Sequence, residues 1–127
     1  MDRTEIARLI KTRLEQIGIE QLKEDYQQSG PINHIIIDNL LPSDVAHQLC
    51  EKFPPESQLT QLNARQEKKY VGVEFLKNQK LIEECIYAFQ DERILNSFTN
   101  ICAIDDLIGD PELYAGGISS MSRTCFL

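Results

Sequence analysis

Residues 4–28 carry apolar side chains with the spacing of a helix. The first five recur at three- and four-residue spacing, which is the pattern of one helix face: Ile6, Leu9, Ile10, Leu14 and Ile17. Gly18 lies inside this pattern, and we expect it to bend or interrupt the helix because glycine is conformationally permissive. Ser29, Gly30 and Pro31 follow. They predict the end of the helix, since glycine favours a helix stop and proline cannot continue one.

Three further stretches show helical spacing. Pro42 and Ser43 suit the first turn of a helix that is expected to end near Phe53, before two prolines. Its inward side chains are predicted to be Val45, Leu49, Cys50 and Phe53. Asn78 and Asp91 can each cap one of the two remaining helices, because short polar side chains accept hydrogen bonds from the first free backbone N–H groups.

β-Branched and aromatic residues gather in other parts of the chain and indicate strands. The strongest case is the run of three isoleucines at residues 35–37, which predicts a strand buried on at least one face. Strands are predicted over residues 32–38, 70–75, 113–118 and 121–127. Residues 56–66 are polar and are expected to form a loop.

The composition is that of an ordinary globular protein. The 127 residues favour one domain over residues 1–127, made of a helical segment, 1–29, and a remainder, 30–127. The net charge of −7 argues against a nucleic-acid partner and against binding to an anionic membrane surface. There is no apolar signal segment at the N-terminus, so a cytoplasmic location is predicted.

The four cysteines do not form a Cys-x-x-Cys pair, and free buried thiols are expected. His47 and Cys50 are three residues apart on one predicted helix, but a nucleophile and base would also need an orienting group. His34 precedes the isoleucine run and is interpreted as a structural histidine. Neither histidine has the spacing of a zinc site.

Two charged clusters have simple interpretations. The basic residues between Arg65 and Lys80, with Tyr70 and Phe75 among them, suggest a phosphate- or RNA-binding surface, but a solvated face around an edge strand is the simpler interpretation. The acidic residues 105–112 lack the order of a calcium loop and are interpreted as a solvated loop.

Three segments are informative through their order and spacing. In residues 32–53 the isoleucine run ends in Asp38-Asn39 and is followed by Leu41-Pro42 and an amphipathic helix. Residues 67–72 read Glu-Lys-Lys-Tyr-Val-Gly, and residues 110–127 run from Asp-Pro-Glu-Leu-Tyr-Ala-Gly-Gly to Cys-Phe-Leu. Together these segments resemble prolyl-hydroxylase-like 2-oxoglutarate/Fe(II)-dependent oxygenases. The first resembles the opening strand and helix of that family, and the second resembles the next strand in a bacterial branch of it. The third resembles the start of the family's double-stranded β-helix.

The resemblance implies an α+β fold in which N-terminal helices pack on an incomplete antiparallel sheet, the opening part of a double-stranded β-helix, or jelly roll. In the family, a His-x-Asp motif follows a strand that ends like Phe126-Leu127, and a second histidine comes much later. These three side chains bind Fe(II) and leave positions open for 2-oxoglutarate and O₂. The sequence stops at Leu127, before such a motif, so we expect no catalytic residue, no metal ligand and no cofactor in this chain.

The same resemblance suggests which residues lie near a substrate or cosubstrate pocket. They are Tyr114, Met121, Arg123 and Phe126. For each of them, a place in the core or on an edge strand is the alternative interpretation.

Two functions therefore stay open. One is the N-terminal fragment of a 2-oxoglutarate/Fe(II)-dependent dioxygenase, a hydroxylase, inactive by itself. The other is a stand-alone, non-catalytic protein-interaction domain. A fragment would leave an apolar face of its sheet uncovered, which predicts self-association through that face.

Overall fold

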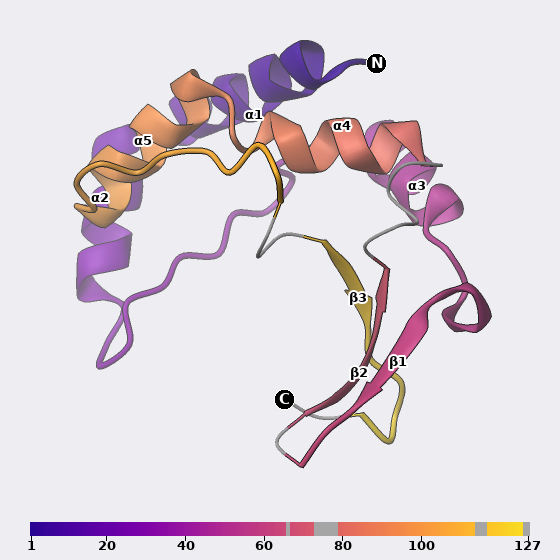
Figure 1. The fold of residues 1–127 in the computed structure, drawn as a ribbon. Coiled ribbons are helices and arrows are strands. Elements are labelled where there is room, and N and C mark those ends of the chain that lie inside the picture. Colours follow the sequence, from indigo (N-terminus) through magenta and orange to yellow (C-terminus); the bar gives the residue numbers. More distant parts are fainter. Residues whose placement is uncertain (66, 73–78, 114–116, 126–127) are drawn as a thin grey trace.

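The computed structural model describes residues 1–65, 67–72, 79–113 and 117–125. In these ranges the chain forms an α+β fold, as predicted, with five α-helices, one short 3₁₀ helix and a three-stranded antiparallel sheet. The helices gather at one end and the sheet extends away from them (Figure 1). The helices are α1 (Arg3–Ile17), α2 (Ile19–Gln28), α3 (Ser43–Lys52), η1 (Glu56–Gln58), α4 (Lys80–Ala88) and α5 (Glu92–Cys102). The strands are β1 (Thr60–Asn63), β2 (Lys68–Gly72) and β3 (Ile118–Ser120).

The break between α1 and α2 confirms the predicted interruption at Gly18. The φ angle of Gly18 is 101°, in a region that side chains with a Cβ rarely adopt, and this turns the chain from one helix into the next. At the other end of α1, Asp2 accepts a hydrogen bond of 2.9 Å from the backbone N–H of Glu5 and caps the helix. The second helix ends at Gln28, directly before the predicted stop.

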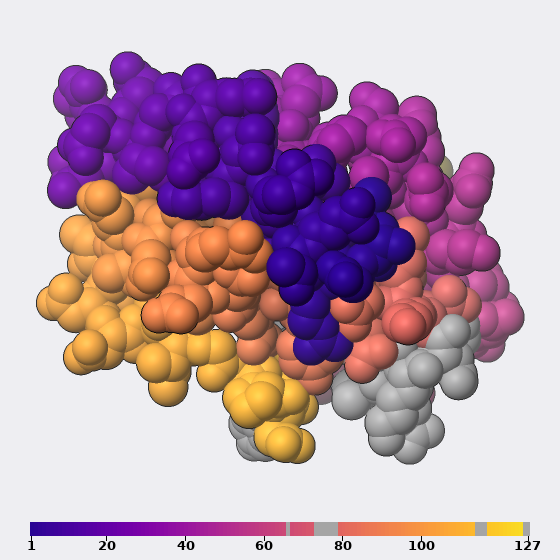
Figure 2. All heavy atoms as spheres, turned by 90° about the horizontal axis from the view of Figure 1, so that it is seen from above, coloured from indigo at the N-terminus to yellow at the C-terminus, as the bar shows by residue number. Residues whose placement is uncertain are grey.

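The main core lies between four helices. Figure 2 shows the indigo N-terminal helix lying against the salmon and orange segments that hold α4 and α5. The buried residues of this core are Ile6, Ala7, Ile10, Leu14, Leu22, Ala88, Ile94 and Ile101. Burying each of the large aliphatic side chains contributes about 1.5–3 kcal/mol to stability, so this cluster holds the helices together.

Both helices predicted after residue 78 are present, as α4 and α5. Asp91 caps α5 as expected, because its carboxylate accepts a 3.0 Å hydrogen bond from the N–H of Arg93. α4 begins at Lys80 after Gln79, whose side chain makes no capping hydrogen bond. The cap predicted at Asn78 lies outside the described residues.

A second, smaller core joins the sheet to the helices. It consists of Leu59, Ile82 and Ile118. Gly72 lies against it so closely that an added Cβ would be 2.7 Å from Leu59 Cδ2. The absence of a side chain at Gly72 therefore lets β2 approach this core.

The sheet has the order β1-β2-β3, with both pairs antiparallel. β1 lies inside residues 56–66, where a loop was predicted, so that prediction is wrong for Thr60–Asn63. All four of its residues are exposed and mostly polar, which gives no period-two signal, and only pairing with β2 makes them a strand.

The strand predicted over residues 32–38 is wrong, because these residues form no strand and none of the strands in the described ranges pairs with them. Ile35 and Ile37 are half-buried against the main core, whereas Ile36 is 83% exposed. A run of β-branched residues favours extended backbone, but a strand also needs a neighbour.

The remaining predictions hold in part. β2 covers the start of the strand predicted over 70–75, and residues 73–75 lie outside the described ones. β3 shares only Ile118 with the strand predicted over 113–118, and its other two residues, Ser119 and Ser120, lie between the two predicted C-terminal strands. Residues 113, 117 and 121–125 form no strand, and residues 114–116 and 126–127 lie outside the described ones. In α3, Val45 is buried as predicted. Cys50 and Phe53, the residue that follows α3, are exposed, so the prediction that their side chains point inward is wrong.

None of the helices in the described ranges is both long and apolar enough to cross a membrane.

Candidate functional site

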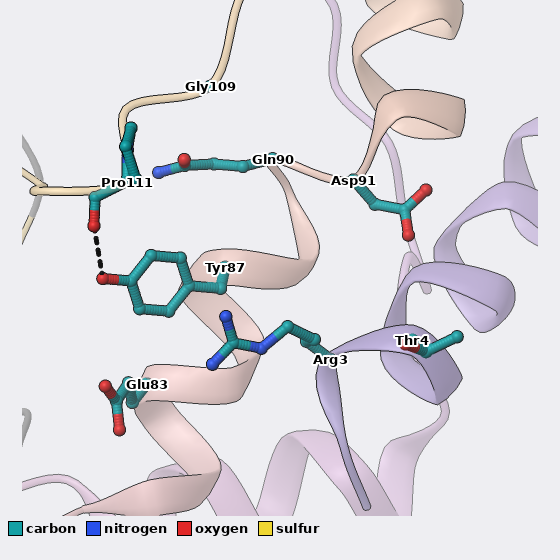
Figure 3. A pocket seen from close by; sticks show the side chains of 8 residues that line it. All are labelled: Arg3, Thr4, Glu83, Tyr87, Gln90, Asp91, Gly109 and Pro111. Carbon is teal, nitrogen blue, oxygen red and sulfur yellow. Dashed lines mark hydrogen bonds between the residues drawn. The ribbon is translucent and has the colours of Figure 1, made fainter.

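A polar pocket of about 510 Å³ opens where α1, α4 and α5 meet the loop that leads to β3. In Figure 3, Arg3 reaches toward Tyr87 from the first turn of α1, and Gln90 and Pro111 close the far side. The described residues that line it are Arg3, Thr4, Glu83, Tyr87, Gln90, Asp91, Gly109 and Pro111.

An ion pair between Arg3 and Glu84 forms the base of this junction. Glu84 is only 7% exposed, and its carboxylate accepts hydrogen bonds from the backbone N–H of Arg3 at 2.7 Å and from Arg3 Nη2 at 2.5 Å. A buried carboxylate needs such partners to offset its lost hydration. The hydrogen bonds from Arg3 hold the pKa of Glu84 below its usual range, against the opposite effect of burial.

Arg3 also contacts an aromatic ring. Its Cζ atom lies 4.4 Å from the centre of the Tyr87 ring, which is the geometry of a cation–π contact. The hydroxyl of Tyr87 donates a 2.9 Å hydrogen bond to the carbonyl oxygen of Pro111, drawn as a dashed line in Figure 3. Tyr87 therefore links the loop before β3 to the N-terminal helix.

A second ion pair lies on the α5 side of the pocket. Asp91 accepts a 2.7 Å hydrogen bond from Arg93 Nε, and this bond lowers the pKa of Asp91. Arg93 Nη2 also donates a 3.4 Å hydrogen bond to the carbonyl oxygen of Thr4. These contacts connect the start of α5 to the first turn of α1.

The chemistry of the pocket follows from these pairings. Arg3 is bound to Glu84 and Asp91 to Arg93, so these charges stabilise the junction of three helices and a loop. The described lining residues include neither histidine nor cysteine, the usual general base and strongest side-chain nucleophile. These charge pairs hold the first turn of α1 against α4 and α5.

A second cavity, of about 470 Å³, is an apolar groove between α3 and α4. Its lining residues are Leu49, Cys50, Phe53, Ile82, Cys85 and Ile86. Burial raises the pKa of the Cys85 thiol, which keeps it protonated and weakly nucleophilic at neutral pH. Cys50 is exposed, so the prediction of a buried thiol is wrong for this residue. The other three cysteines are partly buried, and all four are free.

The residues predicted to lie near a substrate pocket are not gathered in either cavity. Met121 and Arg123 are exposed in the segment after β3 and line neither of them. Tyr114 and Phe126 lie outside the described residues. His47 and Cys50 are both exposed on α3, and no hydrogen bond joins them.

Two other candidate groups can be placed. His34 is exposed, and its ring atom Nδ1 lies 2.9 Å from the carbonyl oxygen of Ile32. The backbone N–H of His34 donates a 2.8 Å hydrogen bond to Ser29 Oγ. Across the described ranges, no three His, Cys, Asp or Glu side chains lie together in a way that could hold a metal ion, and this includes the described acidic residues 105–112.

Sequence reasoning did not identify the Arg3–Glu84 pair. The two residues are 81 positions apart. Glu84 lies among the apolar residues whose spacing predicts this helix, Leu81, Ile82, Cys85, Ile86 and Phe89, and this apolar pattern does not mark a carboxylate. A charged residue among the buried positions of α4 becomes visible only when α1 is packed against that helix.

The chain matches no protein-family model, no curated protein and no solved structure.

Proposed function

We propose that this chain is the N-terminal, non-catalytic part of a prolyl-hydroxylase-like 2-oxoglutarate/Fe(II)-dependent dioxygenase, in which it supports the jelly roll that binds the iron. One observation carries the proposal. β2 and β3 come from two of the three segments that resemble the family, and they lie side by side in an antiparallel sheet, with Tyr70 opposite Ser120. Adjacent antiparallel strands are what the opening of a jelly roll requires.

The role proposed for the chain is structural. The helices bury the main core, and the second core fixes the sheet to α4 through Ile82. The described residues do not fit Fe(II), because they present no group of three ligands. We therefore assign no catalytic step to this chain.

Calorimetry tests the absence of cofactor binding. The chain is titrated with Fe(II) and 2-oxoglutarate together under anaerobic conditions, and no tight binding is expected, since Fe(II) in this family needs three ligands with open positions beside them. Micromolar binding of both by this chain would overturn the assignment.

The gene provides the second test. A His-x-Asp within about five codons after Leu127 would supply two of the iron ligands and support the proposal. A protein extended to include that motif and the later histidine is then expected to bind both Fe(II) and 2-oxoglutarate. A stop codon at position 128 would instead favour the second candidate.

The second candidate is a stand-alone, non-catalytic protein-interaction domain. It is favoured by Ile32 and Ile36, which are 80% and 83% exposed although isoleucine is among the most frequently buried residues.

A further inference from the structure

Another cavity, of about 360 Å³, opens between α1 and the residues that lead into α3. Its described polar lining residues include two arginines and no carboxylate: Arg8, Thr12, Arg13, Gln16, Asn39 and Ser43. Asp38 and Asp44 flank the loop in sequence, but neither of them lines the cavity. A chain with a net charge of −7 therefore has a cavity whose charged lining groups, among the described residues, are positive.

The spacing of residues on α1 builds one wall of this cavity. Arg8, Thr12 and Gln16 follow one another at intervals of four residues, so they lie on one face of the helix. Leu9 and Arg13 are also four residues apart and form the adjoining row. α1 thereby places both arginines beside the same cavity.

Arg13 is held in place without losing its charge. Its Nε and Nη2 atoms donate hydrogen bonds of 3.2 and 3.0 Å to the backbone carbonyl oxygen of Asp38. This carbonyl is neutral, and it uses two of the five guanidinium N–H groups, so three remain for a ligand. No carboxylate of the described residues forms an ion pair with Arg13. The charge is positioned before a ligand arrives, which reduces the entropy lost on binding.

Arg8 carries the second unpaired charge. It is exposed, and its guanidinium makes neither an ion pair nor a hydrogen bond with the part of the chain that the structure describes. Arg3 and Arg93, by contrast, are bound to the carboxylates of Glu84 and Asp91. Both arginines of the cavity can therefore contact an anion that enters it.

We propose that this cavity binds the phosphate group of a small phosphomonoester. At neutral pH such a group carries a charge of about −1.5 to −2, which two guanidinium groups balance. The planar fork of arginine also matches the spacing of phosphate oxygens. Ser43 adds a hydroxyl donor at the first turn of α3, where the helix dipole favours a negative charge as well.

The size of the cavity and its remaining wall favour an organic phosphate over the free ion. Pockets for small organic ligands have volumes of about 300–1,000 Å³, and this cavity lies within that range. The other described lining residues are apolar: Leu9, Leu40, Leu41 and Pro42. We expect the phosphate to contact the arginines and the organic part to cover this apolar wall.

Three probes test the proposal by NMR titration of the full chain: phenyl phosphate, inorganic phosphate, and benzoate, which keeps the ring but carries a single charge. In about 50 mM salt, phenyl phosphate is expected to bind more tightly than inorganic phosphate and at least about tenfold more tightly than benzoate. The amide signals of residues 39–44 and the Nε–H signal of Arg13 are expected to shift. Neither iron nor 2-oxoglutarate takes part, so the result does not depend on the proposed enzyme family.

Matched substitutions locate the site. Arg8→Gln removes a positive charge from the cavity but no polar contact of the fold, and is expected to weaken the binding of phenyl phosphate at least about tenfold. Lys52→Gln removes a positive charge at the other end of α3, where the side chain is also exposed, and should change the affinity less than about twofold. Circular dichroism of both variants checks that the helices are intact.

Four outcomes would overturn the proposal. One is the absence of shifts at residues 39–44 and Arg13 with about 10 mM phenyl phosphate. Another is equal affinity for phenyl phosphate and benzoate, which would mean that any anion is accepted. The third is equal affinity for phenyl phosphate and inorganic phosphate, which would remove the role of the apolar wall. The fourth is equal weakening by Arg8→Gln and Lys52→Gln, which would indicate attraction by overall charge alone.

Discussion

Arg3 binds Glu84 through both its backbone N–H and its guanidinium, and this joins the first turn of α1 to the middle of α4. The same guanidinium lies over the ring of Tyr87. The first residues of the chain are thereby fixed to a helix more than eighty positions away. The stability of the polar pocket should therefore depend on Glu84 more than on any surface carboxylate.

Replacing Glu84 with glutamine is expected to lower the free energy of unfolding by about 1–3 kcal/mol, because Arg3 loses its charged partner at a buried position. Urea denaturation measures this value. The control is Glu15→Gln, which breaks the exposed Lys11–Glu15 pair and should cost no more than about 0.5 kcal/mol. Equal losses in the two variants would contradict a special role for Glu84.

Stability should fall in acid. The folded-state pKa values of Glu84 and Asp91 are both lowered, so each group contributes stability that is complete above its unfolded pKa of about 4. That stability is lost as the pH falls through the folded pKa. Unfolding free energies measured from about pH 7 down to about pH 2 should decline, and the decline should be shallower in Glu84→Gln. An unchanged slope in this variant would count against the ion pair.

Tyr87→Phe removes the hydroxyl that binds Pro111 but keeps the ring under Arg3. The expected cost is about 0.5–1.5 kcal/mol, the net value of one hydrogen bond. Hydrogen exchange should become faster at the amide of Leu113, whose N–H bonds to Asp110 in the same loop. Tyr87→Leu also removes the cation–π contact and should cost about 0.5–1 kcal/mol more. Identical values for the two variants would show that the ring contact contributes nothing.

Gly72→Ala should disturb the second core, because the new Cβ would be 2.7 Å from Leu59 Cδ2. The expected loss is about 1–3 kcal/mol, typical of an overpacked site. The double variant Gly72→Ala/Leu59→Ala should lose less than the sum of the two single losses, since the smaller side chain makes room. Additive losses would show that the two residues do not compete for space.

The cysteines should differ in reactivity. Cys50 is exposed, whereas burial raises the pKa of Cys85, so a water-soluble thiol reagent at neutral pH should modify Cys50 at least about tenfold faster. Mass spectrometry of the digested protein gives both rates. Cys50→Ser should remove the fast phase and leave the rate at Cys85 unchanged, and a fast reaction at Cys85 would contradict its burial.

The helices could be predicted from the sequence alone. Their signals are local: the periodic apolar face of α5, the capping carboxylate of Asp91 and the break at Gly18 each depend on residues a few positions apart. Hydrogen bonds within a helix link residues four positions apart, so short-range patterns are sufficient to find it.

The sequence indicated β2, but β1, the outcome at residues 35–37 and the pocket depend on the tertiary structure. Thr60–Asn63 became a strand through pairing with β2, despite polar and exposed side chains, while the isoleucines at 35–37 remained without a neighbour. Glu84 became a buried ion-pair residue because α1 brings Arg3 to it. Strand pairing and buried charge pairs join positions far apart in the chain, and the free energy that selects them belongs to the packed molecule, so no short stretch of sequence contains the signal.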